Sequence, residues 1–228
     1  MTETEKNLAA VRNRIDGSEK KYGRHPNSVF LLAVSKGQSL EKIQDAIAAK
    51  QFAFGENYLQ EALPKIIALQ NEKIEWHFIG PVQSNKTKKI AEHFAWVHSV
   101  SDIKIAKRLN EQRPAHLPPL NICIEVNVSE EASKSGIQVS DIIALATACS
   151  ALPRLKLRGL MTVPTLQKDF SAQRAELHKL AQHFQLLREK GFALDTLSMG
   201  MSDDLEAAIA EGSTLVRIGT AIFGKRKS

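Results

Sequence analysis

Short apolar runs alternate with amphipathic segments along almost the whole chain. The first run, residues 29–34 (VFLLAV), carries no charge and is followed directly by Ser35 and Lys36. Apolar runs of this kind, bounded by small or polar residues, are typical of buried strands. Seven further runs predict strands that end near Asn57, Gly80, Ser99, Asn127, Met161, Gly200 and Gly219.

The segments between these runs have the spacing of amphipathic helices. In the first of them, about residues 3–22, Leu8 and Ile15 fall on one helical face. Ser39 and Ser101 precede two later segments, and serine is a residue type that caps helix starts. The later helices are predicted over residues 40–49, 59–69, 85–93, 103–112, 140–151, 170–190 and 205–210.

The alternation of strands and helices predicts a fold class. Eight strands, each followed by a helix or by the end of the chain, suit a single (β/α)8 TIM barrel over residues 1–228 with an additional N-terminal helix. An open, doubly wound sheet is the alternative. The sequence has neither GxGxxG nor GxxxxGK[ST], the phosphate turns that mark such a sheet. The pattern therefore favours the barrel.

The chain is basic, with a formal net charge of +6 and basic clusters at residues 86–89 and 225–227. Such clusters can bind nucleic acid. Here no RNA-binding signature and no zinc-finger spacing accompanies them. We therefore expect a solvated face or an attraction for small anions, and no nucleic-acid partner.

The cysteines and the apolar stretches indicate whether a metal site, a membrane span or a secretion signal is to be expected. Cys123 and Cys149 lack the spacing of metal ligands, so we expect two reduced core cysteines and no metal site. No apolar stretch reaches the roughly 18 residues that cross a bilayer. Residues 1–17 are charged and lack the apolar core of a signal peptide. A cytoplasmic protein without a membrane partner is predicted.

Polar side chains occur where several predicted strands end. Lys36 follows the first strand, Asn57 follows the second, His77 lies in the third and Arg217 in the last. In a (β/α)8 barrel, the chemistry collects at the carboxyl ends of the strands. A lysine held at the edge of an apolar core has a lowered pKa, and its neutral amine can form a Schiff base with an aldehyde.

Two turns of small residues follow the last two strands, at residues 198–202 (SMGMS) and at Gly219 and Thr220. Barrels often bind phosphate with these two loops, because glycine and helix starts let backbone N–H groups approach an anion. Ordinary strand-to-helix turns use the same residue types, so both interpretations are equally supported. An amine opposite a phosphate site suits pyridoxal 5′-phosphate (PLP). A Schiff-base aldolase for phosphorylated sugars is the alternative.

Seven motifs follow one another along nearly the whole chain: LLAVSK, FGENYLQE, WHFIGPVQSNK, EVNVSEEASKSG, LRGLMTV, LSMGMSDDLEAAI and VRIGTAIFG. In this order they resemble the pyridoxal phosphate homeostasis protein family. The resemblance implies a barrel like the N-terminal domain of alanine racemase, with PLP as cofactor.

The same resemblance assigns residues to the cofactor. It implies a Schiff base on one lysine, a phosphate site at the last two turns and an arginine beside the pyridine nitrogen. The implied residues are Lys36 for the Schiff base, Ser202, Gly219 and Thr220 for the phosphate, Arg217 for the ring nitrogen, and Asn57 and His77 as pocket lining. Relatives often carry a second lysine two places after the Schiff-base lysine, where this chain has Gln38.

Two consequences of the resemblance argue against catalysis. A cationic arginine disfavours protonation of the ring nitrogen, which makes the ring a weaker electron sink than one paired with aspartate. Racemases of this barrel type also use a tyrosine from a partner's second domain on the opposite face of the substrate. This chain has only Tyr22 and Tyr58, and we expect Tyr58 to pack against a helix.

The predicted function is therefore that of a PLP carrier without clear catalytic turnover. It would maintain intracellular PLP (vitamin B6) homeostasis and affect amino-acid and keto-acid metabolism indirectly. The expected state is a monomer, with PLP-dependent apo-enzymes as candidate partners. Two alternatives remain open: a weak PLP-dependent amino-acid racemase, and an interaction scaffold that only retains PLP.

Overall fold

The computed structural model of the chain describes every residue except 130, 132–133, 166 and 225–228. The basic cluster at residues 225–227 and three residues of the EVNVSEEASKSG motif lie outside the described residues. Within the described part, no helix is both long enough and apolar enough to cross a membrane. The same part contains no group of three or more His, Cys, Asp or Glu side chains placed to hold a metal ion.

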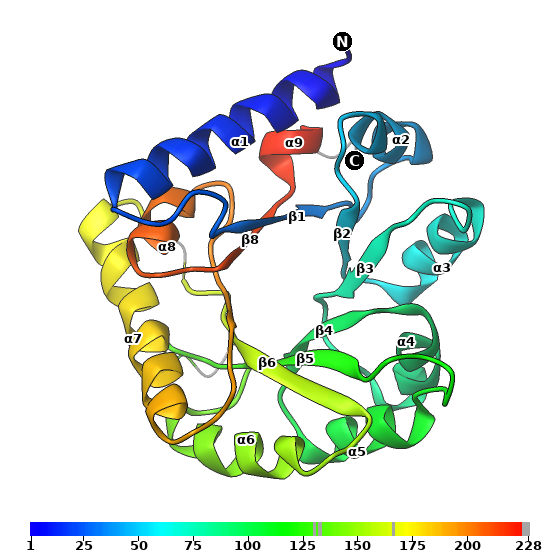
Figure 1. The fold of residues 1–228 in the computed structure, drawn as a ribbon, viewed down its shortest axis with the longest axis vertical. Coiled ribbons are helices and arrows are strands. Elements are labelled where there is room, and N and C mark those ends of the chain that lie inside the picture. The colour runs from blue at the N-terminus through cyan, green and yellow to red at the C-terminus, as the bar shows by residue number, and fades with distance from the viewer. Residues whose placement is uncertain (130, 132–133, 166, 225–228) are drawn as a thin grey trace.

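Parallel strands form a closed barrel in which each strand pairs with the next and β8 pairs with β1 (Figure 1). This confirms the predicted (β/α)8 barrel, and the doubly wound alternative is wrong. The strands are β1 (Phe30–Val34), β2 (Ala53–Glu56), β3 (Glu75–Phe78), β4 (Trp96–Val100), β5 (Leu120–Glu125), β6 (Leu155–Met161), β7 (Thr196–Ser198) and β8 (Leu215–Ile218).

Helices surround the barrel and connect its strands (Figure 1). Every predicted helix is present, and a short helix after β8, α9, was not predicted. The helices are α1 (Glu3–Lys21), α2 (Leu40–Ala48), α3 (Leu59–Ala68), α4 (Thr87–His93), α5 (Ile103–Gln112), α6 (Ile142–Ser150), α7 (Phe170–Glu189), α8 (Leu205–Ala210) and α9 (Thr220–Phe223), with 3-10 turns η1 (Ser84–Lys86) and η2 (Val139–Asp141).

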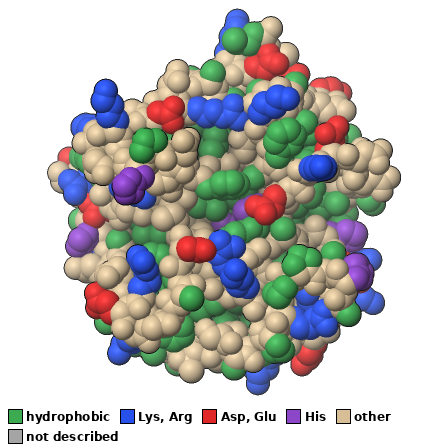
Figure 2. All heavy atoms as spheres, viewed as in Figure 1, with side chains coloured by type: hydrophobic (Ala, Val, Ile, Leu, Met, Phe, Trp, Pro, Cys, Tyr) green, Lys and Arg blue, Asp and Glu red, His purple; other side chains and the backbone are tan. Residues whose placement is uncertain are grey.

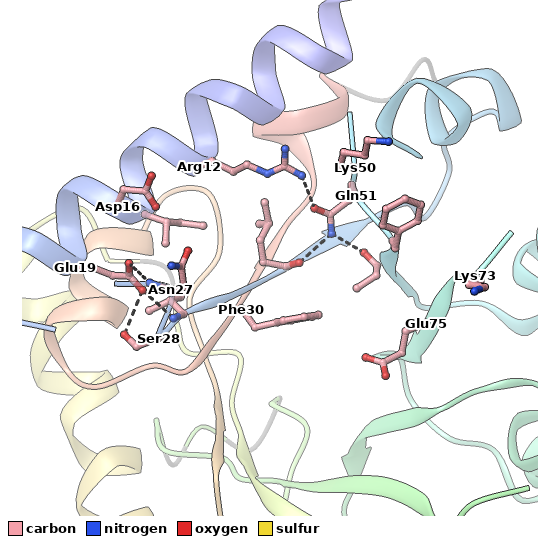
Figure 3. A pocket seen from close by; sticks show the side chains of 15 residues that line it. Arg12, Asp16, Glu19, Asn27, Ser28, Phe30, Lys50, Gln51, Lys73 and Glu75 are labelled. Carbon is pink, nitrogen blue, oxygen red and sulfur yellow. Dashed lines mark hydrogen bonds between the residues drawn. The ribbon is translucent and has the colours of Figure 1, made fainter. Parts of the chain in front are cut away.

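The additional N-terminal helix, α1, lies across the outside of the barrel and packs against α2, α8 and α9 (Figure 1). Its buried Glu19 fixes it to the segment before β1 (Figure 3). The Glu19 carboxylate accepts hydrogen bonds from the N–H groups of Asn27 (3.0 Å) and Val29 (2.8 Å) and from the hydroxyl of Ser28 (3.2 Å). These contacts border a cavity of about 670 Å³ at the amino ends of β1 and β2 (Figure 3).

The barrel interior is more polar than the layer between strands and helices. In β3, Trp76 and Phe78 belong to the large apolar core, whereas His77 between them points to the other side of the strand. Branched apolar residues usually fill such interiors. Here buried polar side chains, among them His77, Ser198 and Arg217, occupy part of the space.

Candidate cofactor site

A cavity of about 320 Å³ lies at the carboxyl ends of the barrel strands. It lies between the ends of β1, β2 and β8 and the turn after β7. Six of the seven residues that the sequence motifs assign to a cofactor line it together: Lys36, Asn57, Ser202, Arg217, Gly219 and Thr220.

Lys36 is half-buried and follows β1 at a sharp turn. Gly37 has a φ of +68°, a left-handed conformation that glycine adopts without strain. The turn is held by the Gly37 N–H, which donates to the Glu61 carboxylate (2.9 Å), and by the Gln38 N–H, which donates to the Ser35 carbonyl (3.1 Å). The chain therefore leaves the strand directly after Lys36, with its amine at the barrel mouth.

A buried ion pair fixes the strand ends beneath Lys36. The Lys65 ammonium of α3 lies 2.7 Å from a Glu56 carboxylate oxygen and donates to the Ser35 carbonyl at 2.8 Å. The Ser35 hydroxyl donates to the same Glu56 oxygen at 2.6 Å. Burial raises the pKa of Glu56, although Lys65 and Ser35 act in the opposite direction. The end of β1 is thus bound to the end of β2 and to α3.

The opposite wall has the features of an anion site. Gly219 begins α9, and a Cβ there would lie 3.2 Å from the Val34 carbonyl oxygen, so glycine allows close backbone packing. The Ala221 N–H in the first turn of α9 donates to the Ser202 hydroxyl at 3.4 Å. N–H groups in the first turn of a helix have no acceptor within the helix and favour anions.

Arg217 places a cation in the floor of the cavity. Its Nη1 donates to the Ser198 carbonyl and hydroxyl, both at 2.7 Å, and its Nη2 donates to the Thr162 carbonyl at 2.7 Å. Burial lowers the pKa of the guanidinium, while Asp204 and Glu125 act to raise it. An arginine remains protonated under such conditions, so the cavity contains a fixed positive charge.

Asn57 supplies an acceptor in the cavity wall. Its Oδ1 is buried and has no hydrogen-bond partner among the described residues. A buried, unpaired carbonyl oxygen costs free energy that a bound hydroxyl donor would recover. The residues therefore fit a ligand with a carbonyl carbon for Lys36, an anion for the α9 turn and a hydroxyl near Asn57.

His77 is not part of this cavity. It is buried inside the barrel and lines a different cavity of about 440 Å³ at the amino ends of the strands, together with Glu75 and Trp96. The expectation that His77 lines the cofactor pocket stays a prediction that the lining of this cavity does not support. β3 continues to Phe78, so His77 lies before the end of the strand, whereas Ile79 beyond that end lines the cofactor cavity.

Tyr58 directly precedes α3 and is 52% exposed. Tyr22 directly follows α1, and its hydroxyl donates to Glu206 at 2.9 Å. Neither tyrosine is among the residues that line the cavity.

Several lining residues were missed although most of them lie within the seven motifs, because most of their side chains are apolar and carry no reactive group. Gln38 also lines the cavity, and its Oε1 accepts a hydrogen bond from the Lys42 ammonium at 3.2 Å. Their position directly after predicted strands is the signal that could have identified them. The further lining residues are Val34, Ile79, Val163, Met201, Asp203 and Gly224.

Comparison with known proteins identifies the family. A profile of the family described as "Alanine racemase, N-terminal domain" matches residues 6–227. The pyridoxal phosphate homeostasis protein of Pseudomonas aeruginosa is 56% identical over 226 residues, which are 99% of this chain and 97% of that relative. This chain belongs to the pyridoxal phosphate homeostasis protein family. The resemblance inferred from the seven motifs is thereby confirmed.

A solved structure of a less similar protein contains PLP. PipY of Synechococcus elongatus, with PLP bound, is 33% identical, covers 97% of this chain and 100% of its own, and superposes with a TM-score of 0.84. Alanine racemase of Corynebacterium glutamicum is 19% identical with a TM-score of 0.69, and the match covers 96% of this chain and 62% of the racemase. The racemase therefore shares the barrel fold of this chain.

Proposed function

We propose that this protein binds PLP through a Schiff base on Lys36 and maintains the intracellular supply of PLP. The observation that carries the proposal is the single cavity shared by Lys36, Arg217 and the glycine turn at Gly219. An amine, a fixed cation and an anion site within about 320 Å³ match the aldehyde, the ring and the phosphate of PLP. When bound, PLP supplies an electrophilic carbon that condenses with an amine and releases one water.

Each residue has a role in this proposal. Lys36 provides the amine, and Asn57 accepts a hydrogen bond from the ring hydroxyl. Arg217 faces the pyridine nitrogen, where its charge keeps that nitrogen unprotonated. The phosphate binds the Ser202 hydroxyl and the turn formed by Gly219 and Thr220. The names of the relatives and the PLP in PipY support PLP as the ligand, and the lining of the cavity supports the roles of the residues.

We further propose that the protein is a carrier and that its effects on amino-acid and keto-acid metabolism are indirect. An unprotonated pyridine ring is a weak electron sink, which disfavours chemistry on a bound amino acid. Tyr22 is committed to Glu206 and Tyr58 is exposed, so neither provides the second acid or base that racemisation needs. In this proposal the protein is a cytoplasmic monomer, and residues 1–228 form one cofactor-binding domain. It delivers PLP to apo-enzymes.

The absorption spectrum of the purified protein tests cofactor binding. After incubation with PLP, we expect a visible band that borohydride abolishes with a mass increase on Lys36. Lys36→Ala should lose the band, whereas Lys89→Ala, an exposed lysine outside the cavity, should retain it. A wild-type protein without a band would overturn the proposal.

A substrate panel separates the carrier from the racemase. The PLP-loaded protein is incubated with individual amino acids, and racemisation, transamination and decarboxylation are followed by chiral chromatography. We expect no turnover above the free-PLP background. A rate on the order of 1 s⁻¹ or faster that is abolished in Lys36→Ala would show that the protein is an enzyme.

A further inference from the structure

A continuous series of side-chain hydrogen bonds crosses the barrel interior from the cofactor cavity to the opposite end. Arg217 Nη1 donates to Ser198 Oγ at 2.7 Å, and Ser198 Oγ lies 2.9 Å from His98 Nδ1. His98 Nε2 lies 2.9 Å from His77 Nδ1, and His77 Nε2 lies 2.9 Å from a Glu75 carboxylate oxygen. Ser198, His77 and His98 are fully buried.

The Glu75 end of this series, together with neutral imidazole rings, fixes the direction of every hydrogen bond in it. A guanidinium can only donate, so Ser198 accepts from Arg217, and the same hydroxyl donates to His98 Nδ1 when the neutral His98 ring carries its proton on Nε2. A carboxylate can only accept, so His77 Nε2 carries a proton that it donates to Glu75. His98 Nε2–H then donates to His77 Nδ1, which leaves each imidazole neutral and in a single tautomer.

The surroundings favour these neutral imidazoles. Burial lowers the pKa of His98 well below its usual value, and the neighbouring Arg217 lowers it further. Burial also lowers the pKa of His77, although Glu75 acts in the opposite direction. The His77 ring stacks on Trp96 with ring centroids 5.3 Å apart and an interplanar angle of 6°, which restricts its rotation.

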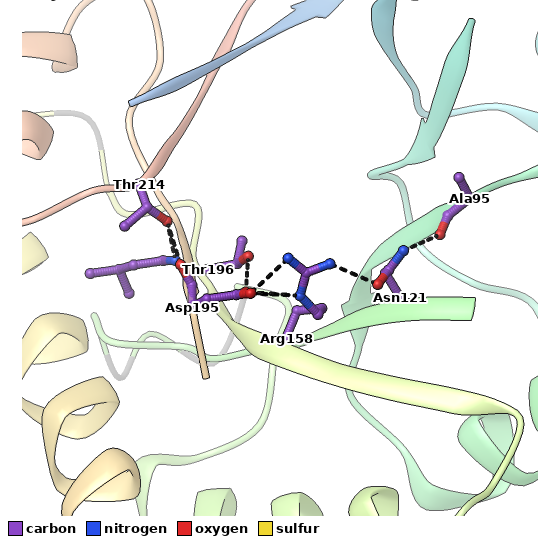
Figure 4. A network of polar contacts seen from close by, with 7 residues as sticks. Ala95, Asn121, Arg158, Asp195, Thr196 and Thr214 are labelled. Atoms are coloured by element: carbon purple, nitrogen blue, oxygen red, sulfur yellow. Dashed lines mark hydrogen bonds and ion pairs between the residues drawn. The ribbon is translucent and has the colours of Figure 1, made fainter. Parts of the chain in front are cut away.

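The far end of the series reaches the surface at the amino ends of the strands. On the face shown in Figure 2, acidic, basic and histidine side chains meet near the centre of the molecule. The Glu75 side chain is 47% exposed there. Beside it, Arg158 lies over the Trp96 ring (4.6 Å to its centroid) and pairs with Asp195 at 2.7 Å (Figure 4). This end of the barrel therefore has an ion pair of its own beside Glu75.

We propose that His98 and His77 are positioning residues for Arg217 and that, through Ser198, they fix the guanidinium in the orientation used in the cofactor cavity. This rests on the proposed function, in which Arg217 faces the pyridine nitrogen of PLP. A Ser198 hydroxyl whose proton is bound by His98 keeps a lone pair directed at Arg217. Without an acceptor at position 98, the hydroxyl rotates freely and Arg217 loses one of its fixed partners.

Substitutions at position 98 separate this role from simple packing. His98→Leu places an apolar side chain in the interior and removes both hydrogen bonds. His98→Gln retains a carbonyl acceptor for Ser198 and an N–H donor for His77, so it preserves the direction of the series. His178→Leu is the control, because His178 is a half-exposed histidine on α7 that pairs with Glu211.

The readouts are the absorption maximum of the PLP-loaded protein and the PLP dissociation constant at equilibrium. For His98→Leu we expect a shifted maximum and about a tenfold weaker affinity, as for the loss of one hydrogen bond to a charged group. His98→Gln should restore both values, and His178→Leu should leave both unchanged. If His98→Leu does not fold, Ser198→Ala replaces it and should weaken PLP binding in the same direction.

The wild-type protein distinguishes the two proposals. A wild-type band together with a folded His98→Leu variant of unchanged maximum and affinity overturns the positioning role alone. A wild-type protein that binds no PLP overturns the proposed function and the role that rests on it. Nitrogen-15 NMR of the imidazoles in the PLP-free protein provides a separate check. Two neutral rings protonated only at Nε2 are expected, and any other tautomer contradicts the series.

Discussion

Gly80 lies so close to Asn57 that no side chain fits between their backbones. A Cβ at position 80 would overlap the carbonyl oxygen and the Cα of Asn57, and both atoms are backbone. Gly80→Ala should therefore push Asn57 away from the cofactor cavity. We expect weaker PLP binding and a loss of about 2 kcal/mol in the free energy of unfolding, measured by equilibrium dialysis and by urea denaturation.

Gly17 provides the control for this prediction. It lies in α1, and a Cβ there would meet no atom within 4 Å. Gly17→Ala should leave PLP binding unchanged and raise the free energy of unfolding by up to about 1 kcal/mol. If Gly80→Ala bound PLP as tightly as Gly17→Ala, the wall formed by Asn57 would have no part in the site.

Single residues were predictable from the sequence where their position alone defines their surroundings. Lys36 and Gly219 follow strands directly, and every barrel brings such positions to one end. The contacts of His77 and His98 could not be predicted, because their partners are distant in the sequence. The two histidines are 21 residues apart, and His98 meets Ser198 across 100 residues. No local pattern reveals which side chains meet inside a closed barrel.

At the scale of elements, the Glu56–Lys65 ion pair holds α3 against the ends of β1 and β2. The Lys65 side chain is 10% exposed and the Glu56 side chain 0%, so water screens the pair little. Lys65→Met would leave a buried carboxylate without its partner. We expect a loss of about 3 kcal/mol in the free energy of unfolding, measured by urea denaturation.

Two further variants test the cause of that loss. Lys65→Met combined with Glu56→Gln should regain most of it, because the buried charge is then absent. Lys89→Met breaks the exposed pair with Glu92 and should cost less than about 0.5 kcal/mol. Equal losses for Lys65→Met and Lys89→Met would contradict the role of burial.

Element types were predictable from periodicity, but their ends were less so. Ser39 is at the start of α2 as expected, yet its side chain makes no capping hydrogen bond. For α5 the cap is Asp102, whose carboxylate accepts from the Lys104 N–H at 2.7 Å, and not the predicted Ser101. The helix α9 has four residues, too few to show a 3.6-residue repeat.

For the whole molecule, the polar barrel interior makes stability depend on pH. In the folded protein, burial lowers the pKa of His77 and of His98 below their usual value of about 6.5. As the pH falls below about 6.5, the unfolded chain binds protons at these histidines before the folded chain does. Their contribution to stability is therefore complete above that pH and is lost as the pH falls.

Buried carboxyls act with the opposite sign, so the histidine effect has to be isolated. Burial raises the pKa of Glu56 and Glu125, which lets the folded protein bind protons above the usual carboxyl range. The free energy of unfolding is measured against pH for the wild type and for His98→Gln, and one profile is subtracted from the other. The subtraction cancels the contributions that both proteins share, which include those of Glu75 and Arg158 near the far end. We expect the free energy of unfolding in urea to fall more steeply for the wild type than for His98→Gln between about pH 7.5 and 5.5. Parallel pH profiles would mean that His98 carries the same charge in the folded and unfolded states, and that the neutral series through the barrel does not exist.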